Sequence, residues 1–280
     1  MDYPKYIRWF FLLLLLIPTQ WLAAQELKVY SELRRQQTLS PGETYQGSIR
    51  MENIGEQPMV VKVFQQDYFY DVQQRKVYNT RIQAERSNRS WITFKPDYLE
   101  LQPNREAIVD FIVTVPHSTL EQPLEGTYWS MLVVQPAPLE ETDTPLMLIK
   151  GQKIRRQIQY GIQMVTHIAN TGVKDISVED TWVEADEEGK TNFYAVLRNK
   201  GTLGFKSDIA IELYNEQGQS NGKIDGMPAF IYPGCAVLKK IELPELASGT
   251  YPSLLLVDGG ADALFGMQVN LDIHNERVMR

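Results

Sequence analysis

Residues 153–169 carry the sequence feature that most constrains the fold of this chain. Over the sequence KIRRQIQYGIQMVTHIA, apolar residues recur at alternate positions, including Ile154, Ile158 and Ile162, with mostly polar residues between them. A period of two is typical of a β-strand with one apolar face and one solvated face. At about 3.3 Å per residue the stretch would extend roughly 50 Å, longer than most strands. We therefore predict one long strand over Lys153–Ala169 with a bulge or bend at Gly161.

The rest of the sequence predicts short strands separated by turns, and hence an all-β protein. In the first half, strong strand patterns occupy residues 44–51, 59–64, 107–115 and 127–134. In the second half we expect strands near Ile176–Val183, Phe193–Arg198, Ile209–Tyr214, Val237–Leu243, Ser253–Val257 and Leu264–Ile273. No window of eleven or more residues has the periodicity of a helix. Short strands at regular intervals are typical of immunoglobulin-like β-sandwiches.

A weak internal repeat divides the chain into two similar halves. The segment Glu125–Val134, EGTYWSMLVV, matches Ser248–Val257, SGTYPSLLLV. Each half also has an Asn-x-Gly after a strand and a Pro-led turn before another, at Asn53 and Pro103 and at Asn199 and Pro233. The same marks in the same order predict two copies of one fold. We therefore expect two tandem immunoglobulin-like domains, residues 25–169 and residues 170–280, with the Gly-Thr-Tyr strand penultimate in each.

The first residues have the pattern of a cleaved leader. Lys5 and Arg8 form a basic region before an apolar run that extends from Trp9 to Ile17, and Ala23-Ala24 supply small residues for a signal peptidase. The run is too short for a membrane-spanning helix, which needs about 20 residues. We expect residues 1–24 to be a signal peptide. The mature protein would then be exported, without a stable membrane anchor.

Charge and residue inventory exclude several classes of function. The chain has 28 Lys plus Arg against 35 Asp plus Glu, a net charge of −7, whereas nucleic-acid binders need a basic surplus for phosphate contacts. Its three histidines are scattered, and no nucleophile motif, phosphate loop or metal-ligand spacing is present. We expect no enzymatic activity, no catalytic residue, no metal, no cofactor and no nucleic-acid partner. The single cysteine, Cys235, is expected to be a buried free thiol.

One segment resembles a known family. Glu125–Val133, followed by Pro136, is similar to a motif of the periplasmic chaperones of the chaperone–usher pilus pathway. The long alternating stretch resembles the last strand of their first domain. The resemblance implies that this strand is added to an exported pilus-like subunit that lacks a strand of its own.

The same resemblance implies a site for the carboxylate at the end of that subunit. In the family, an arginine of the first strand and a lysine late in the long strand bind it. Arg34 or Arg35 falls near the first place, and Gln163 stands at the second. A neutral amide does not supply the charge of a lysine at a carboxylate, so this part of the mechanism departs from the family.

The chain is about as similar to a second family, the exported proteins of Gram-positive bacteria that interact with WxL-type cell-wall proteins. That resemblance rests on Leu39–Gly42, Asn53–Gly55 and Tyr160–Val165. It also implies two sandwich domains, and a surface protein as the partner. The two resemblances together imply a bacterial protein of the periplasm or the cell surface.

The long strand is the first candidate binding surface. On this hypothesis, the edge Lys153–Ile162 pairs with a partner protein by β-strand addition, guarded by its positive charges. The candidate residues are Arg34, Arg35, Ile154, Arg156, Ile158, Tyr160 and Ile162. The alternative is that this strand only closes the core of the first domain.

An aromatic segment is the second candidate surface. Tyr68, Phe69, Tyr70 and Tyr78 could stack on sugars, although aromatic residues in strands mostly belong to the core. Our leading hypothesis is a non-enzymatic, periplasmic-chaperone-like assembly factor that binds an exported protein subunit. The alternative is a cell-envelope glycan- or peptidoglycan-binding protein, or a surface-adhesion accessory protein.

Overall fold

The computed structural model describes residues 27–70, 72–73, 76–79, 84–121, 123–138, 146–149, 152–155, 158–215, 217–260 and 263–273. For residues 76–79, 138, 146–149 and 152–155 it describes the backbone only. The predicted signal peptide, residues 1–24, and the candidate residue Arg156 lie outside the described residues. Across the described ranges, no helix is long and apolar enough to cross a membrane.

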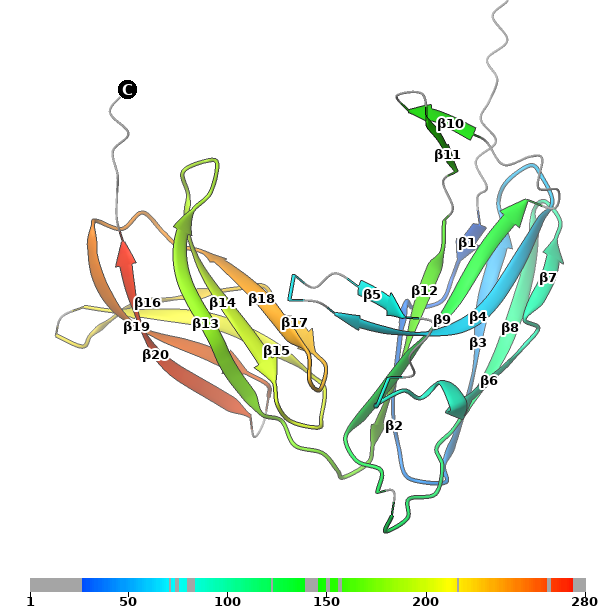
Figure 1. Ribbon diagram of the computed structural model, residues 1–280, viewed down its shortest axis with the longest axis horizontal. Helices are drawn as coiled ribbons and strands as arrows, with labels where there is room; N and C mark the ends of the chain where they lie inside the picture. The colour runs from blue at the N-terminus through cyan, green and yellow to red at the C-terminus, as the bar shows by residue number, and fades with distance from the viewer. Residues whose placement is uncertain are drawn as a thin grey trace, which may run out of the picture.

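Two groups of strands follow each other along the chain (Figure 1). The first group is β1 (Leu27–Val29), β2 (Arg34–Leu39), β3 (Thr44–Asn53), β4 (Met59–Tyr70), β5 (Lys76–Asn79), β6 (Ile92–Lys95), β7 (Tyr98–Leu101), β8 (Arg105–Thr114), β9 (Thr127–Pro138), β10 (Leu146–Ile149), β11 (Gln152–Arg155) and β12 (Tyr160–Ile168), with a short 3-10 helix, η2 (Arg89–Trp91). The second group is β13 (Ile176–Ala185), β14 (Thr191–Asn199), β15 (Phe205–Tyr214), β16 (Ser220–Asp225), β17 (Ala229–Ile231), β18 (Ala236–Glu242), β19 (Gly249–Asp258) and β20 (Leu264–Ile273).

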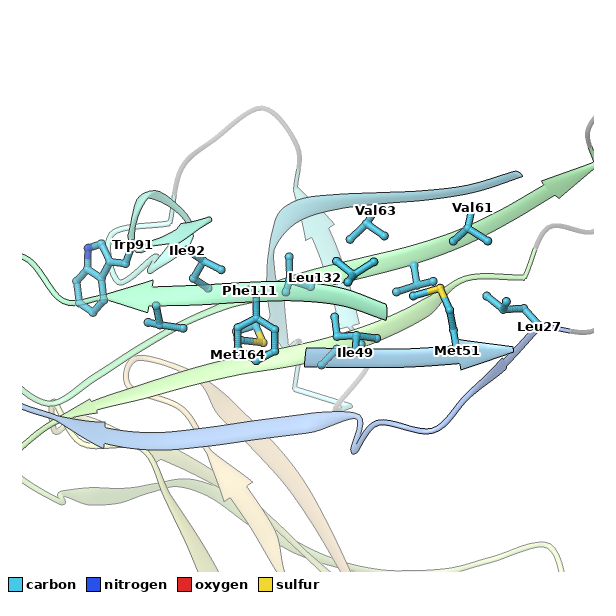
Figure 2. Packing of buried hydrophobic residues seen from close by; sticks show 14 of the residues in the cluster. Leu27, Ile49, Met51, Val61, Val63, Trp91, Ile92, Phe111, Leu132 and Met164 are labelled. Carbon is cyan, nitrogen blue, oxygen red and sulfur yellow. The ribbon is translucent and has the colours of Figure 1, made fainter. Parts of the chain in front are cut away.

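The first group folds into a sandwich of two sheets. One sheet has the order β1-β3-β8-β6, and the other has the order β2-β12-β9-β4-β5, with β7 beside β4. Alternate residues of each strand point inward, so Ile49 and Met51 of β3 face Leu132 of β9 and Val61 and Val63 of β4 across the core (Figure 2). The strands β10 and β11 form a separate hairpin that stands away from the sandwich (Figure 1).

The second group forms a smaller sandwich, with the sheets β13-β14-β18 and β16-β15-β19-β20 and with β17 beside β15. Its core is again made of alternate strand residues, such as Phe193 and Leu197 of β14 and Ile209 and Ile211 of β15. The predicted fold class, all-β with two tandem immunoglobulin-like sandwiches, is confirmed. The six strands expected after residue 170 are also confirmed, as β13, β14, β15, β18, β19 and β20.

The internal repeat has a counterpart at the level of single hydrogen bonds. Asn53 ends β3 and Asn199 ends β14, and both side chains are fully buried. The backbone N–H of Asn104 donates to the carbonyl of Asn53, and that of Gly234 donates to the carbonyl of Asn199, each at 2.8 Å. Both donors have a positive φ, 56° and 74°, which Asn and Gly tolerate best. The Pro-led turns recognised in the sequence therefore close the same corner in both sandwiches.

The prediction of one long strand over Lys153–Ala169 is wrong. β11 ends at Arg155 and pairs with β10, whereas β12 begins at Tyr160 and pairs with β9. Continuing the register of β12 with β9 would place Ile158 opposite Pro136, which has no N–H to donate. The ladder therefore stops before Ile158.

The bulge expected at Gly161 is also absent. The pairing of β12 with β9 runs without a shift from Tyr160 to His167. A Cβ on Gly161 would lie 2.4 Å from Sδ of Met131 on the neighbouring strand. The glycine thus makes room for a close side chain, and it does not bend the strand.

Candidate functional site

The two sandwiches are joined at two places. The end of β4 and the turn that follows it reach toward β17 and β18 of the second sandwich (Figure 1), and the N–H of Leu238 donates to the carbonyl of Val72 at 2.6 Å. Near the start of β9, the N–H of Thr127 donates to the carbonyl of Thr202 at 2.9 Å. The N–H of Gly204 donates to Oγ1 of Thr127 at 2.7 Å. Hydrogen bonds at two separate places therefore hold one sandwich against the other.

A tight glycine contact supports the junction near Thr127. Gly126 has φ 69°, and a Cβ on it would lie only 2.0 Å from the carbonyl oxygen of Thr202. No other residue fits there without moving the backbone of the second sandwich. The angle between the sandwiches is thus fixed by backbone packing as well as by side chains.

An apolar and aromatic cluster fills the space between these two places. It combines Tyr68, Trp129, Met131, Val133 and Val165 of the first sandwich with Tyr232 and Cys235 of the second. We call Tyr68, Tyr70, Trp129, Phe230 and Tyr232 the interdomain aromatic cluster. The ring of Tyr232 lies at its centre, 4.7 Å from Trp129, 4.8 Å from Phe230, 5.6 Å from Tyr70 and 6.0 Å from Tyr68, measured between ring centroids. The prediction that Cys235 is buried is confirmed.

A hydrogen-bond network crosses the interdomain aromatic cluster. The hydroxyls of Tyr68 and Tyr232 are 2.7 Å apart, and the hydroxyl of Tyr232 donates to Oε1 of Gln163 at 3.3 Å. Nε2 of Gln163 donates to the hydroxyl of Tyr70 at 2.8 Å. Burial raises the pKa of Tyr68 well above its usual value and raises the pKa of Tyr232 to about 12. Both phenols therefore stay protonated and can donate over the whole physiological range.

Arg34 lies beside this network on β2. In the parallel pairing of β2 with β12, Arg34 is the register partner of Gln163. Its guanidinium carbon lies 3.6 Å from the centroid of Phe230, and its Nη2 donates to the hydroxyl of Tyr232 at 3.3 Å. No carboxylate among the described residues forms an ion pair with Arg34. Its charge is instead stabilised by the ring faces of the second sandwich.

Arg35 points elsewhere, although it was an equal candidate in the sequence. It is the register partner of Met164, and its Nη2 donates to the carbonyl of Ser48 at 3.2 Å. Of the two arginines, only Arg34 therefore stands beside Gln163.

His167 is a buried titratable group of the same junction. Oγ1 of Thr127 accepts the N–H of Gly204, so its own proton is free to point at Nδ1 of His167, 2.7 Å away. That arrangement requires a neutral imidazole with its proton on Nε2. Burial, and secondarily the charge of Arg34, lowers the pKa of His167 from 6.5 to about 4.

We predict that His167 makes the folded protein less stable as the pH falls. The unfolded chain takes up a proton at its usual pKa of 6.5, while the folded protein resists protonation down to about 4. The free energy of unfolding should therefore fall between these values, by at most about 1.4 kcal/mol per pH unit. Denaturant titrations at half-unit steps of pH would measure this slope.

The control for this prediction is His167→Asn, because Oδ1 of an asparagine can still accept from Thr127. The variant should lose the slope between pH 6.5 and 4. It should keep the loss of stability at lower pH that Asp186 causes. Hydrogen bonds from the backbone of Lys190 and the side chain of Lys240 lower the pKa of Asp186 from 3.8 to about 2. An equal slope in both proteins above pH 4 would contradict the role of His167.

The aromatic candidate surface belongs mainly to this junction. Tyr68 has none of its surface exposed, so the expectation that its ring is available to a sugar is wrong. Phe69 and Tyr70 are half-buried, and Tyr70 stacks on Tyr232. The side chain of Tyr78 lies outside the described atoms.

The sequence did not identify Phe230 and Tyr232, the two residues that the second sandwich contributes to the interdomain aromatic cluster. Phe230 and Tyr232 alternate in the segment FIYPG, which was interpreted only as a turn before a strand. An aromatic residue at every second position of that short segment was the available signal.

The candidate residues on and before β12 lie along an edge that is only partly covered. β2 pairs with β12 from Gln163 to Ile168, whereas the segment Tyr160–Ile162 pairs on one side only, with β9. Ile162 is fully buried, Tyr160 is half-buried with its hydroxyl bonded to the carbonyl of Leu27, and Ile158 is 45% exposed. Ile154 lies in β11 of the protruding hairpin. Exposure thus increases from Ile162 through Tyr160 to Ile158, toward the end of the sandwich.

Other hollows lie on the second sandwich. The larger one, about 420 Å³, is on the outer face of β15, β16 and β19, with Ala210 and Leu256 in its wall and Asp208, Asp225 and Asp258 around it. Among the described residues, no group of three His, Cys, Asp or Glu side chains could hold a metal ion.

No protein-family model matches the chain, and no curated protein matches it. Solved structures do resemble it. A chain of the chaperone–tip adhesin complex of CFA/I fimbriae biogenesis is 10% identical with a TM-score of 0.46, covering 88% of this chain and 98% of its own. The class 5 fimbriae chaperone CfaA is 8% identical with a TM-score of 0.45, covering 89% of this chain and 100% of its own.

A third similar structure is from the complex of the Salmonella enterica pilin SafA with the chaperone SafB. It is 14% identical with a TM-score of 0.40, and it covers 88% of this chain and 97% of its own. These identities and scores are too low to carry an argument about function. The solved structures give no support to the resemblance with WxL-interacting proteins.

Proposed function

We propose that this protein is a non-enzymatic, exported assembly factor of the periplasmic-chaperone type. It binds a β-rich protein subunit by strand addition along the edge that begins at Ile162 and runs toward the hairpin of β10 and β11. The bound subunit would pair its backbone with the uncovered side of this edge and take the emerging side chains into its own core.

The observation that carries the proposal is the exposure of Ile158. Ile158 lies two residues before Tyr160 and four before Ile162, whose side chains face the core of the first sandwich. It lies beyond the end of that core, however, and is 45% exposed. An exposed apolar side chain next to the uncovered backbone edge of Tyr160–Ile162 is a ready site for another strand. A subunit bound there would extend the apolar core of the first sandwich into its own.

We predict that Ile158→Asp abolishes capture of the partner. A carboxylate buried in the core of the bound subunit without a partner costs several kcal/mol, so binding should fall by at least a hundredfold. Affinity purification of the tagged protein from its native host, followed by mass spectrometry, would measure capture. The wild type should retain a small exported β-rich protein in near-equal amount, and the variant should not.

The matched control is Ile108→Asp. Ile108 is 54% exposed on β8, in the sheet that does not contain β12, so the same change adds the same charge away from the edge. Ile162→Asp is unsuitable, because Ile162 has no exposed surface and its replacement would damage the core. Equal capture by the wild type and by Ile158→Asp would refute the proposal.

The glycan-binding alternative has less support from the described residues. Tyr68 is enclosed in the interdomain aromatic cluster, and Tyr70 has one face covered by Tyr232.

The departure at Gln163 also bears on the proposal. Arg34 and Gln163 are both bonded to Tyr232, so binding of a subunit would depend on the strand edge more than on its terminal carboxylate.

A further inference from the structure

The other sheet edges of the second sandwich are mostly guarded against pairing with other chains. In the second sandwich, β13 has a bulge between Val178 and Asp180, and the N–H of Leu238 in β18 is occupied by Val72 of the first sandwich. The edge strands β13, β16 and β18 carry charged residues, namely Glu179, Asp180, Glu184, Lys223, Asp225, Lys239, Lys240 and Glu242. Bulges, charges and covering segments are the usual means by which sheets avoid edge-to-edge association.

β20 has none of these protections over most of its length. Within the described part of the chain, its ten residues pair only with β19, in a register without a bulge. Residues 264–271 include neither a charged residue nor a proline. Toward its end, β20 approaches β13 across a hollow of about 240 Å³ that Trp182 and Asn270 help to line. The unguarded part is therefore Leu264–Gln268.

The side chains of this part are incompletely covered on both faces. Leu264 is 69% exposed on the outer face, where Gly266 and Gln268 are also exposed. Phe265 and Met267 point toward the core but are only half-buried, in contrast to Val269 and Leu271 further along the strand. An added strand would cover apolar surface here as well as satisfy backbone groups.

We propose that Leu264–Gln268 pairs with the same segment of a second copy of this chain, antiparallel and about a two-fold axis at Gly266. In that register Leu264 lies opposite Gln268, and Phe265 lies opposite Met267, a favourable pairing of an aromatic ring with a thioether. No charged residue falls within the paired segment, so no like charges face each other. Gly266 of each copy lies at the axis, so the two glycines face each other there.

The self-complementarity of the segment is what selects a second copy as the occupant. An uncharged, apolar edge discriminates against charged strands, and the two-fold arrangement brings apolar residues against apolar residues on the inner face. The pairing uses only five residues a side, so the dimer is weak and concentration-dependent. Because each copy carries a net charge of −7, the dimer should become tighter as salt is raised.

The test is Gly266→Lys. A Cβ at this position would make only ordinary contacts, 3.6 Å from Leu254 and 3.9 Å from Leu256, so the variant should fold normally. It would place two ammonium groups against each other at the axis. Sedimentation velocity of the purified protein from about 1 to about 500 µM would follow association over the range of weak dissociation constants. The wild type should shift from monomer to dimer, and the variant should associate at least tenfold more weakly.

Three controls make the result specific. Gly266→Thr adds a side chain without a charge and should still dimerise, and Gln217→Lys adds the same charge at an exposed turn and should dimerise like the wild type. Ile158→Asp alters the edge proposed for subunit binding and should leave the dimer intact, so failure of one proposal is distinguishable from failure of the other. A monomeric wild type at every concentration, or a dimer unaffected by Gly266→Lys, would overturn the inference.

Discussion

Tyr232→Ala is expected to split the thermal unfolding of this protein into two transitions and to cost about 4 kcal/mol. Tyr232 is almost fully buried and touches four aromatic rings, three of which belong to the first sandwich. Its removal leaves a cavity between the sandwiches and removes the hydroxyl that Tyr68 and Arg34 contact. The sandwiches would then unfold independently, because each has a core of its own. Differential scanning calorimetry would resolve the two transitions.

Two further variants serve as controls. One distinguishes the contribution of the ring from that of the hydroxyl, and the other tests whether loss of any tyrosine has the same effect. Tyr232→Phe keeps the ring contacts and loses only the hydrogen bonds, so it should cost about 1 to 2 kcal/mol and retain one transition. Tyr214→Ala removes a tyrosine from β15 that lies outside the cluster, and it should leave the coupling of the sandwiches unchanged. If Tyr232→Ala unfolds in one transition at the midpoint of the wild type, the cluster does not couple the two sandwiches.

Coupling at this junction matters for the proposed function. The same β12 contributes Gln163 to the network and, a few residues earlier, the uncovered edge at Tyr160–Ile162. The junction therefore fixes the second sandwich relative to the strand that would receive the subunit. In Tyr232→Ala, we would expect the edge to remain while its orientation toward the second sandwich is less tightly fixed.

The elements of this fold could be predicted because their signals are local. Alternation of apolar residues and turn residues at fixed spacing marked most strands, including all six expected in the second sandwich. The division of Lys153–Ala169 could not be predicted in this way. The strand pattern continues through Ile158, and it is the neighbour across the sheet, Pro136, that cannot extend the ladder.

The organisation of the candidate site depended on contacts between distant residues. Arg34 and Tyr68 were assigned to two different hypotheses, yet both contact Tyr232, which is 198 and 164 residues away along the chain. No periodicity connects residues so far apart. The exposure of Ile158 and the burial of Ile162 could not be distinguished either, because the two share a face and differ only in where the sandwich ends.

The repeat is the feature for which sequence and structure agree in most detail, and it supports a second prediction of large effect. Asn53 donates from Nδ2 to the carbonyls of Gln57 and Leu101, at 2.8 and 3.0 Å, and accepts the N–H of Gly55 at 3.0 Å. Asn199 donates in the same way to the carbonyls of Leu203 and Ile231, at 2.9 and 3.0 Å, and accepts the N–H of Gly201 at 2.9 Å. Each side chain ties the end of one strand to a distant one at the same corner.

We predict that Asn53→Ala and Asn199→Ala each cost about 4 kcal/mol, because each leaves one buried carbonyl, one part-buried carbonyl and one part-buried N–H without a partner. The two costs should be similar, since the two sets of hydrogen bonds have the same geometry. Urea denaturation of each variant would measure them. The control is Asn215→Ala, which removes a side chain that accepts from Gln217 and Gln219 in an exposed turn and should cost about 1 kcal/mol.

The same substitutions made in Tyr232→Ala would assign each cost to one sandwich. Once the sandwiches unfold separately, Asn53→Ala should lower only the transition of the first and Asn199→Ala only that of the second. A shift of both transitions by one substitution would mean that the sandwiches still unfold together. A cost below about 1 kcal/mol for either asparagine would mean that water replaces its hydrogen bonds, and the corner would then not depend on this residue. If both costs are large and each stays in its own sandwich, the repeated asparagine is a main support of each domain.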